Sequence, residues 1–263
     1  RQRVQQELGL EDQGVVVTEG FSQWILEDNF CNGRPAWEEV GVTMVDDVTP
    51  FEHMKLRMLN GTHSTLAYLG FLAGHEYVAD AANDSDFQKL LLGMWQDEII
   101  PTLNMPTGID LQAYANDLMV RYQNPELHHR LYQIAMDGSQ KLPQRLLGTL
   151  RDHLAANRLP KRIMLAIAGW MRYVTGIHEN GNIFEVQDPW TPKIKQLARN
   201  SGFINSQLNS EKTSDYVNQL LQIEEIFGSE LANHTVFFQQ LTSLLKELTE
   251  NGVRSVLRQT AIA

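Results

Sequence analysis

Apolar residues recur at helical spacing through most of the chain from residue 49 onward. The pattern predicts a first helix over residues 49–73, with Thr49 as N-cap, Pro50 in the first turn and Glu52 completing a capping box. Gly74 is the expected C-terminal stop. Further helices are predicted over residues 85–100, 109–122, 125–136, 143–156, 161–177, 192–200 and 212–250, with a turn at 179–182 and Gly252 after the last helix.

The N-terminal part follows a different pattern. Residues 1–13 predict a polar arm or the remnant of a linker. The β-branched runs at 14–18 and 41–45 predict short strands, whereas the aromatic and apolar segment 21–28 is compatible with a strand or a helix. Because neither a repeat nor a Ser/Gly linker interrupts the rest, we expect one mainly α domain over residues 14–263, with a small β element at its start.

Composition narrows the class of protein. With 263 residues and 43% hydrophobic residues, the chain can bury a sizeable core. The net charge of −10 argues against non-specific binding to nucleic acid or to an anionic membrane, and no apolar run approaches the roughly 20 residues that span a bilayer. The single cysteine, Cys31, excludes an internal disulfide and a thiolate-based zinc site. We therefore expect a cytoplasmic protein, and the start at Arg1 without Met leaves open that it is a fragment of a longer chain.

The helix over residues 49–73 carries the candidate chemistry. On a regular α-helix, Asn60 and His63 lie about 140° and 80° around the axis from Lys55, so the three share one arc. Apolar residues occupy most other directions, which predicts a helix buried nearly all round. Gly61 in mid-helix indicates the close approach of a backbone or a ligand.

These three residue types suit the oxidation of an alcohol. A lysine in a water-poor cavity loses part of its preference for the charged form and can act as a general base on a hydroxyl. An asparagine amide can donate to the alkoxide oxygen, and a histidine can hold a neighbouring hydroxyl. Lysine, asparagine and histidine on one helix also occur as a solvated stripe or as hydrogen-bonded core groups, so spacing alone leaves these interpretations open.

Two further cations follow in the segment 137–145. Lys141 and Arg145 could contact a substrate hydroxyl or carboxylate, although a capped helix start with solvated cations has the same pattern. Arg121 and Arg130 are weaker candidates for such contacts, and we expect them to be surface charges. The eight histidines show no ligand spacing, so no metal site is predicted.

The string Lys55-Leu-Arg-Met-Leu-Asn-Gly-Thr-His63 resembles the K-x4-N-x2-H signature of the long-chain polyol dehydrogenases, which include mannitol 2-dehydrogenase, fructuronate reductase and tagaturonate reductase. Similar segments surround it at 21–28, 33–35, 40–42 and 137–143, and the likeness covers residues 14–205 most strongly. The resemblance implies a multi-helical fold like the C-terminal domain of 6-phosphogluconate dehydrogenase. It also implies a zinc-independent enzyme that uses NAD or NADP.

By this resemblance, Lys55 is the general base, Asn60 stabilises the alkoxide, and His63 with Lys141 and Arg145 binds the substrate. The family's Rossmann domain precedes the helical one, but no G-x-G-x-x-G after a strand is found here. We therefore expect the cofactor domain to be absent from this chain and to be its partner, and the residues that bind the cofactor stay unassigned.

The resemblance implies interconversion of a secondary alcohol in a linear sugar acid or polyol with its ketone. The cations favour mannonate and fructuronate over mannitol and fructose. An alternative is a non-catalytic helical interaction module that descends from such an enzyme after loss of the cofactor domain. The sequence sets neither the oligomeric state nor the sugar.

Overall fold

A computed structural model describes residues 1–16, 18–205 and 207–260, and of residue 260 it describes the backbone alone. The chain divides into two compact units, Arg1–Val48 and Thr49–Ala263. The division between these units falls between Val48 and Thr49.

The first unit contains helix α1 (Gln2–Leu8), the strands β1 (Ile25–Glu27) and β2 (Thr43–Val45), and a 3-10 turn at Trp37–Val40. β1 and β2 pair in parallel, with Ile25 opposite Thr43. The ambiguous segment 21–28 is therefore a strand in its second half. The strand expected over 14–18 is not formed at its described positions, and residue 17 lies outside the described residues.

One arginine holds the loop between the two strands. Arg34 donates from Nε and Nη2 to the carboxylate of Asp28 at 2.7 and 2.6 Å, and from Nη1 to Glu38 at 2.5 Å. These bonds hold the pKa values of both carboxyl groups below their usual range. The two acceptors come from either side of Arg34 along the chain, so the guanidinium closes the loop on itself.

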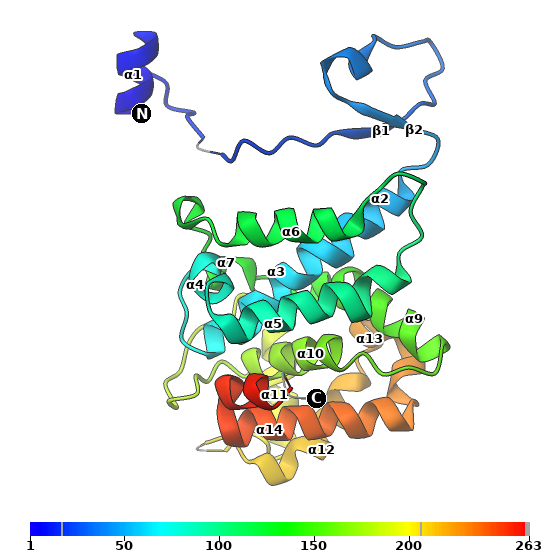
Figure 1. Cartoon of the computed structure of the whole chain (residues 1–263). Coiled ribbons are helices and arrows are strands. Elements are labelled where there is room, and N and C mark those ends of the chain that lie inside the picture. The colour runs from blue at the N-terminus through cyan, green and yellow to red at the C-terminus, as the bar shows by residue number, and fades with distance from the viewer. Residues whose placement is uncertain (17, 206, 261–263) are drawn as a thin grey trace. The chain divides into compact units, whose positions relative to one another are not determined.

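The second unit is helical throughout, as the sequence predicts (Figure 1). Its α-helices are α2 (Thr49–Met54), α3 (Thr62–Thr65), α4 (Val78–Ala82), α5 (Ser85–Gly93), α6 (Leu111–Tyr122), α7 (Leu131–Ile134), α8 (Gly138–Leu142), α9 (Gly148–Ala155), α10 (Lys161–Tyr173), α11 (Thr191–Asn200), α12 (Thr213–Leu221), α13 (Glu224–Ala232) and α14 (Thr235–Thr260). The π-helical segments are Lys55–Gly61, Leu66–Gly70, Met94–Ile99 and Pro143–Leu147, and 3-10 turns lie at Ile100–Thr102, Pro125–Leu127 and Ser210–Lys212.

The predicted helix over 49–73 exists, but it is not a regular α-helix. It runs over residues 49–72 and changes to π-helical pitch twice, and Gly74 follows it with a φ of 89°. Lys55 is exposed and Asn60 is half-buried, so the expectation of burial nearly all round is wrong for the first half. From Gly61 to Gly70 every residue except His63 is buried, so the expectation holds there.

Helix α10 forms the centre of the second unit. Every residue from Ile163 to Tyr173 is buried, and the helix packs against α3 and the segment Leu66–Gly70 as well as against α14 (Figure 1). Its N-terminus is held by a distant carboxylate, because the buried Glu98 accepts hydrogen bonds from the backbone N–H groups of Arg162 and Ile163 at 2.9 and 2.8 Å.

The C-terminal region differs from the prediction of one helix over 212–250. Three helices occupy it, and α14 continues beyond Gly252, where a φ of 74° breaks its regular geometry. Glu179 accepts a hydrogen bond from the Val253 backbone N–H at 2.6 Å, so its carboxylate caps the segment after the break. The expectation that Gly252 follows the last helix is therefore wrong.

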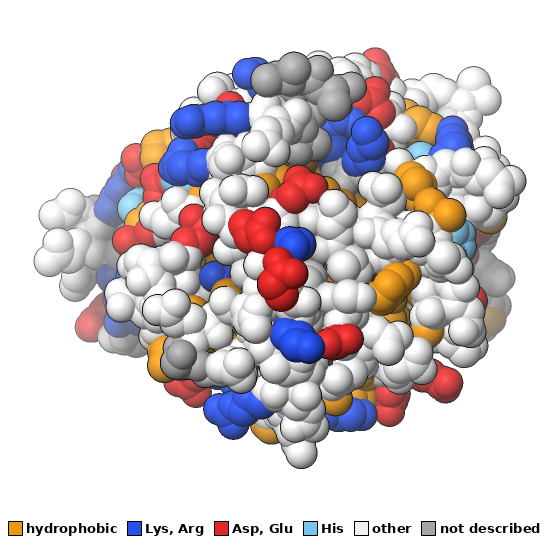
Figure 2. Space-filling model, turned by 90° about the horizontal axis from the view of Figure 1, so that it is seen from below, with side chains coloured by type: hydrophobic (Ala, Val, Ile, Leu, Met, Phe, Trp, Pro, Cys, Tyr) orange, Lys and Arg blue, Asp and Glu red, His pale blue; other side chains and the backbone are white. Residues whose placement is uncertain are grey.

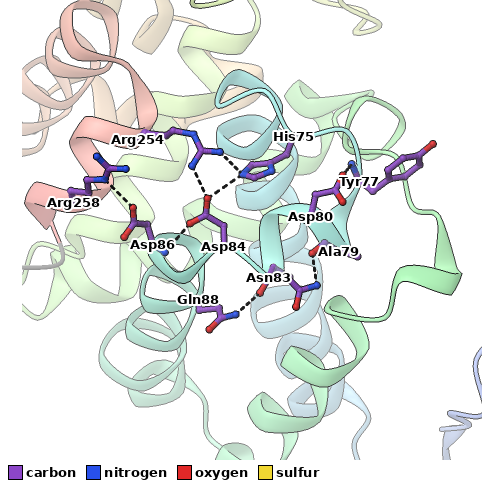
Figure 3. Close-up of polar contacts among 11 residues, drawn as sticks. His75, Tyr77, Ala79, Asp80, Asn83, Asp84, Asp86, Gln88, Arg254 and Arg258 are labelled. Carbon is purple, nitrogen blue, oxygen red and sulfur yellow. Dashed lines mark hydrogen bonds and ion pairs between the residues drawn. The ribbon is translucent and has the colours of Figure 1, made fainter.

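The end of α14 is tied to the start of α5 by charged side chains (Figure 3). Arg254 donates to Asp84 at 2.7 Å and to Nε2 of His75 at 3.1 Å, and Arg258 donates to Asp86 at 3.3 Å. Asp84 also caps α5 by accepting from the Asp86 N–H. On the face shown in Figure 2, acidic and basic side chains are interspersed and apolar side chains are scattered.

Candidate active site

The candidate site lies where two π-helical segments cross. The segment Lys55–Gly61 packs against Pro143–Leu147, which joins α8 to α9. A Cβ atom at Gly61 would lie 2.7 Å from the backbone oxygen of Arg145, closer than real Cβ contacts come. The close approach expected from Gly61 is therefore confirmed, and the approaching group is a backbone. Single turns of π-helix occur frequently at functional sites.

The π-helical pitch changes how the three candidate side chains are arranged. In a π-helix, residue i bonds to residue i+5, so residues five apart come close to one side of the helix. Lys55 and Asn60 are five apart, and they lie closer together around the axis than the regular helix of the sequence analysis places them. Lys55 at the start of this face is exposed, whereas Asn60 and His63 are half-buried. The described residues therefore do not supply the water-poor cavity expected around Lys55.

Side chains from other helices stabilise this pitch. The Met58 carbonyl accepts from Trp95 Nε1 at 2.9 Å and from Thr62 Oγ1 at 2.6 Å. The Leu59 carbonyl accepts from the Tyr122 hydroxyl at 2.6 Å. Because a change of helical pitch disturbs the regular bonding of carbonyl groups, these donors compensate for it. Trp95 and Tyr122 thus help to position the segment that carries Lys55 and Asn60.

His63 has a neutral and partly unsatisfied imidazole. Its Nε2 is buried and has no hydrogen-bond partner among the described residues. The ring stacks on Tyr122 with centroids 5.2 Å apart. Burial lowers the pKa of His63 to about 3, and the neighbouring His129, Arg145, Arg121 and Lys141 act in the same direction. At neutral pH the imidazole can therefore exchange a hydrogen bond with a neutral hydroxyl that enters beside it.

Lys141 and Arg145 come from the opposite helix. Lys141 donates from Nζ to the carbonyls of Ile134 and Met136, so it uses two of its three donors. Arg145 donates to the Ser64 hydroxyl at 2.9 Å, next to His63 in the chain. Burial, and then the neighbouring Arg145, lower the pKa of Lys141, and burial lowers that of Arg145. The structure thus brings both predicted cations to the His63 end of the site.

A carboxylate outside the site holds the helix that carries these cations. Asp188 accepts from the backbone N–H and the hydroxyl of Ser139, both at 2.7 Å, and from the Trp190 N–H at 2.8 Å. Ser139 is buried in the first turn of α8, so Asp188 caps this helix from another part of the chain. It fixes the turn that leads to Lys141.

Several residues near His63 were not predicted. Arg121, a weaker candidate expected to be a surface charge, acts on the His63 ring together with His129. Tyr122 was not singled out at all. Arg121, Tyr122 and His129 are far from His63 in the sequence, so no helical spacing connects them with it. Arg130 is exposed and lies 3.9 Å from Glu76, in agreement with the expected surface charge.

A dinucleotide needs a phosphate-binding turn, and a metal ion needs several ligands close together. β1 and β2 are parallel, but a loop with a 3-10 turn joins them, without the glycine-rich turn and crossing helix that bind a pyrophosphate. The described part of the chain therefore does not fit a dinucleotide phosphate site. Within it, no three His, Cys, Asp or Glu side chains gather as a metal site would need, and no helix is long and apolar enough to cross a membrane.

Comparison with known proteins gives consistent matches. The chain is 45% identical over 253 residues to D-mannonate oxidoreductase of Escherichia coli, covering 96% of this chain and 50% of that protein. It is 35% identical to mannitol 2-dehydrogenase of Aspergillus niger, covering 95% of this chain and 49% of that protein. The chain thus spans about half the length of the curated relatives it matches.

Solved structures support the same relationship. The complex of Pseudomonas fluorescens mannitol 2-dehydrogenase with NAD and D-mannitol matches with a TM-score of 0.85 and 36% identity, over 99% of this chain and 50% of that one. The sequence model of the mannitol dehydrogenase C-terminal domain matches residues 47–249. This range holds the helices that cross at Gly61, and it confirms the predicted family and the mainly α fold. The chain belongs to the mannitol dehydrogenase C-terminal domain family.

Proposed function

We propose that the protein is a nicotinamide-dependent oxidoreductase that interconverts a secondary alcohol of a linear sugar acid or polyol with its ketone, in the cytoplasm and without a metal ion. The observation that carries this proposal is the buried Nε2 of His63, which lacks a partner among the described residues beside Lys141 and Arg145. A hydroxyl group of the substrate would form a hydrogen bond with Nε2 of His63, and a negative charge on the substrate would neutralise Lys141 and Arg145. Membership of a family with mannonate and mannitol enzymes supports the same reaction class.

Each residue has a role that follows from its place. Lys55 takes the hydroxyl proton at the exposed end of the site, and Asn60, five residues along the π-helical turn, donates from its amide to the oxygen as negative charge develops. His63 exchanges a hydrogen bond with a neighbouring hydroxyl and so fixes the position of the carbon chain. An exposed lysine is a poor base because water stabilises its charged form. Lys55 is exposed among the described residues, so its role requires that the bound substrate and the cofactor domain exclude water from it.

We propose a sugar acid such as mannonate as the preferred substrate. Lys141 and Arg145 lie on the His63 side, and both are half-buried, so burial lowers the pKa of each. A carboxylate placed there gains charge-assisted hydrogen bonds in a water-poor setting. A neutral polyol such as mannitol would gain much less from the two cations.

We also propose that NAD or NADP is held by a Rossmann domain outside this chain. NAD is favoured because the mannitol 2-dehydrogenase structure that matches this chain contains it. When bound, the nicotinamide would supply the acceptor for the hydride that leaves the carbon. The residues of this chain would bind and orient the substrate and remove the proton.

The proposal is tested by assaying the protein, expressed from its own gene, with mannonate, fructuronate, mannitol and fructose and either nicotinamide cofactor. We expect turnover of the sugar-acid pair at a higher kcat/KM than of the polyol pair. Absence of turnover with all four substrates would contradict an oxidoreductase of this class.

A further inference from the structure

The structure contains a cavity, separate from the candidate active site, whose wall carries more positive than negative side chains. It has a volume of about 460 Å³, within the range of small-molecule sites, and is lined by the turn after α10, by α11 and by the loop that follows α11. None of its lining residues is shared with the candidate active site. In Figure 1, α11 lies on the α14 side of α10, away from α2 and α6.

Arg172 is the most unusual residue of this cavity. It is only 4% exposed, and among the described residues its guanidinium donates to neutral acceptors, the Thr175 hydroxyl at 3.1 Å and the carbonyls of Ile177 and His178. Its Nε is buried and has no partner among the described residues. Burial lowers the pKa of Arg172 to about 10, so the group still carries its charge at neutral pH. A buried cation without a paired anion is energetically costly.

Two further cations line the same cavity. Lys195 and Arg199 are one turn apart on α11, and neither forms an ion pair with a described residue. Several arginines elsewhere in the second unit are paired with carboxylates. Paired examples there are Arg57 with Asp152, Arg151 with Glu230, Arg162 with Asp97 and Arg254 with Asp84.

The negative charge on the cavity wall is smaller than the positive charge. Glu179 is the single carboxylate among the described lining residues, and it already accepts the Val253 N–H at 2.6 Å. Three cations therefore face one engaged carboxylate, in a chain whose net charge is −10. The amide side chains of Asn180, Asn205 and Gln207 add groups that can bind hydroxyls.

We infer that this cavity binds a small hydroxylated oxyanion, a sugar phosphate or a sugar acid, at a site distinct from the candidate active site. The oxyanion pairs with Lys195 and Arg199 and offsets the charge of Arg172, and the hydroxyl groups bind the amide side chains. Phosphate and carboxylate share this chemistry, and the experiment separates them. The inference does not depend on the proposed dehydrogenase activity.

The test is isothermal titration calorimetry of the 263-residue chain with glucose 6-phosphate, gluconate, inorganic phosphate and glucose. We expect saturable binding of glucose 6-phosphate or gluconate that weakens with added salt, and much weaker binding of neutral glucose. Tighter binding of the phosphate ester or of the carboxylate identifies the preferred anion, and either result supports the site.

Variants locate the binding. Lys195→Gln combined with Arg199→Gln removes two charge-assisted contacts and should weaken binding about tenfold or more. Lys193→Gln is the matched control, because Lys193 lies on the same helix but over the Trp190 ring at 4.4 Å. It should bind like the wild type.

Three results would overturn the inference. The first is that none of the three anions binds saturably. The second is that glucose binds as tightly as the anions, and the third is that the double variant binds the anions as tightly as the wild type does. The single variant Arg199→Gln, at an exposed position, gives the same comparison if the double variant does not fold. Thermal unfolding followed by circular dichroism checks that each variant is folded.

Discussion

Gly61 and Arg145 meet at the point where the two π-helical segments cross. A methyl group on Gly61 would lie 2.7 Å from the carbonyl oxygen of Arg145. This contact sets the separation between the helix that carries Lys55, Asn60 and His63 and the helix that carries Lys141 and Arg145. The geometry of the candidate site therefore depends on the absence of a side chain at one position.

Gly61→Ala should force the two helices apart. We expect a loss of about 1–3 kcal/mol in the free energy of unfolding, measured by urea denaturation, because overpacking shifts a backbone that cannot yield locally. Gly148→Ala is the matched control. Its Cβ would meet the Arg57 side chain at an ordinary 3.6 Å, so this change should leave stability unchanged or raise it slightly. Equal stability of the two variants would contradict the tight crossing.

The pKa of His63 predicts a loss of stability in mild acid. Its value of about 3 in the folded chain lies below the ordinary 6.5, so the unfolded chain binds the proton first as pH falls. The contribution is fully present above pH 6.5 and is lost progressively between pH 6.5 and 3, by about 2 kcal/mol between pH 7 and 5.

Urea denaturation of wild type and His63→Asn at both pH values measures this effect. The substitution should make the free energy of unfolding less dependent on pH. The exposed His53 provides the control, since His53→Asn should keep the wild-type dependence. An unchanged pH dependence in His63→Asn would show that this imidazole is not buried in its neutral form.

Some of this site follows from the sequence and some does not. The spacing of Lys55, Asn60 and His63 and the close approach at Gly61 are visible because they lie within one helix. The π-helical pitch is not, because it depends on Trp95 and Tyr122, which bind the carbonyls of Met58 and Leu59 from other helices. Apolar spacing reports which face is buried, whereas the choice between α and π bonding is made by tertiary partners.

The same limit explains the errors in the helix boundaries. The apolar spacing over 212–250 continues across the breaks near Ile223 and Asn233, so three helices look like one. The run at 14–18 has β-branched residues but no neighbouring strand in the first unit, so its described positions stay irregular. Strand pairing is a non-local property that a single segment does not contain.

Asp188 is expected to be a positioning residue for the candidate site. Asp188→Ala removes the cap from α8 and leaves the buried Ser139 without its acceptor, which should cost about 3 kcal/mol of stability. Since this helix carries Lys141, KM for a sugar acid should rise about tenfold, with a smaller change in kcat. Glu185→Ala, an exposed carboxylate of the same loop, should change neither constant. A fall in kcat alone would contradict a role in binding.

Lys141→Gln tests the preference for a sugar acid. Loss of one charge-assisted contact should lower kcat/KM for mannonate about 10- to 100-fold and leave that for mannitol nearly unchanged. The exposed Lys89 offers a control, and Lys89→Gln should be indistinguishable from wild type. Charge reversal at Arg145 should act in the same direction. If both substrates lose activity equally, neither cation is selective for a carboxylate.

The most direct test of the central claim is the turnover of Lys55→Ala in the protein expressed from its own gene, with fructuronate or fructose and a reduced nicotinamide cofactor. General base catalysis by Lys55 predicts a fall in kcat of about 10²–10⁴-fold at neutral pH, with the free energy of unfolding unchanged because Lys55 is exposed. An active wild type and an equally active Lys55→Ala variant would contradict the account.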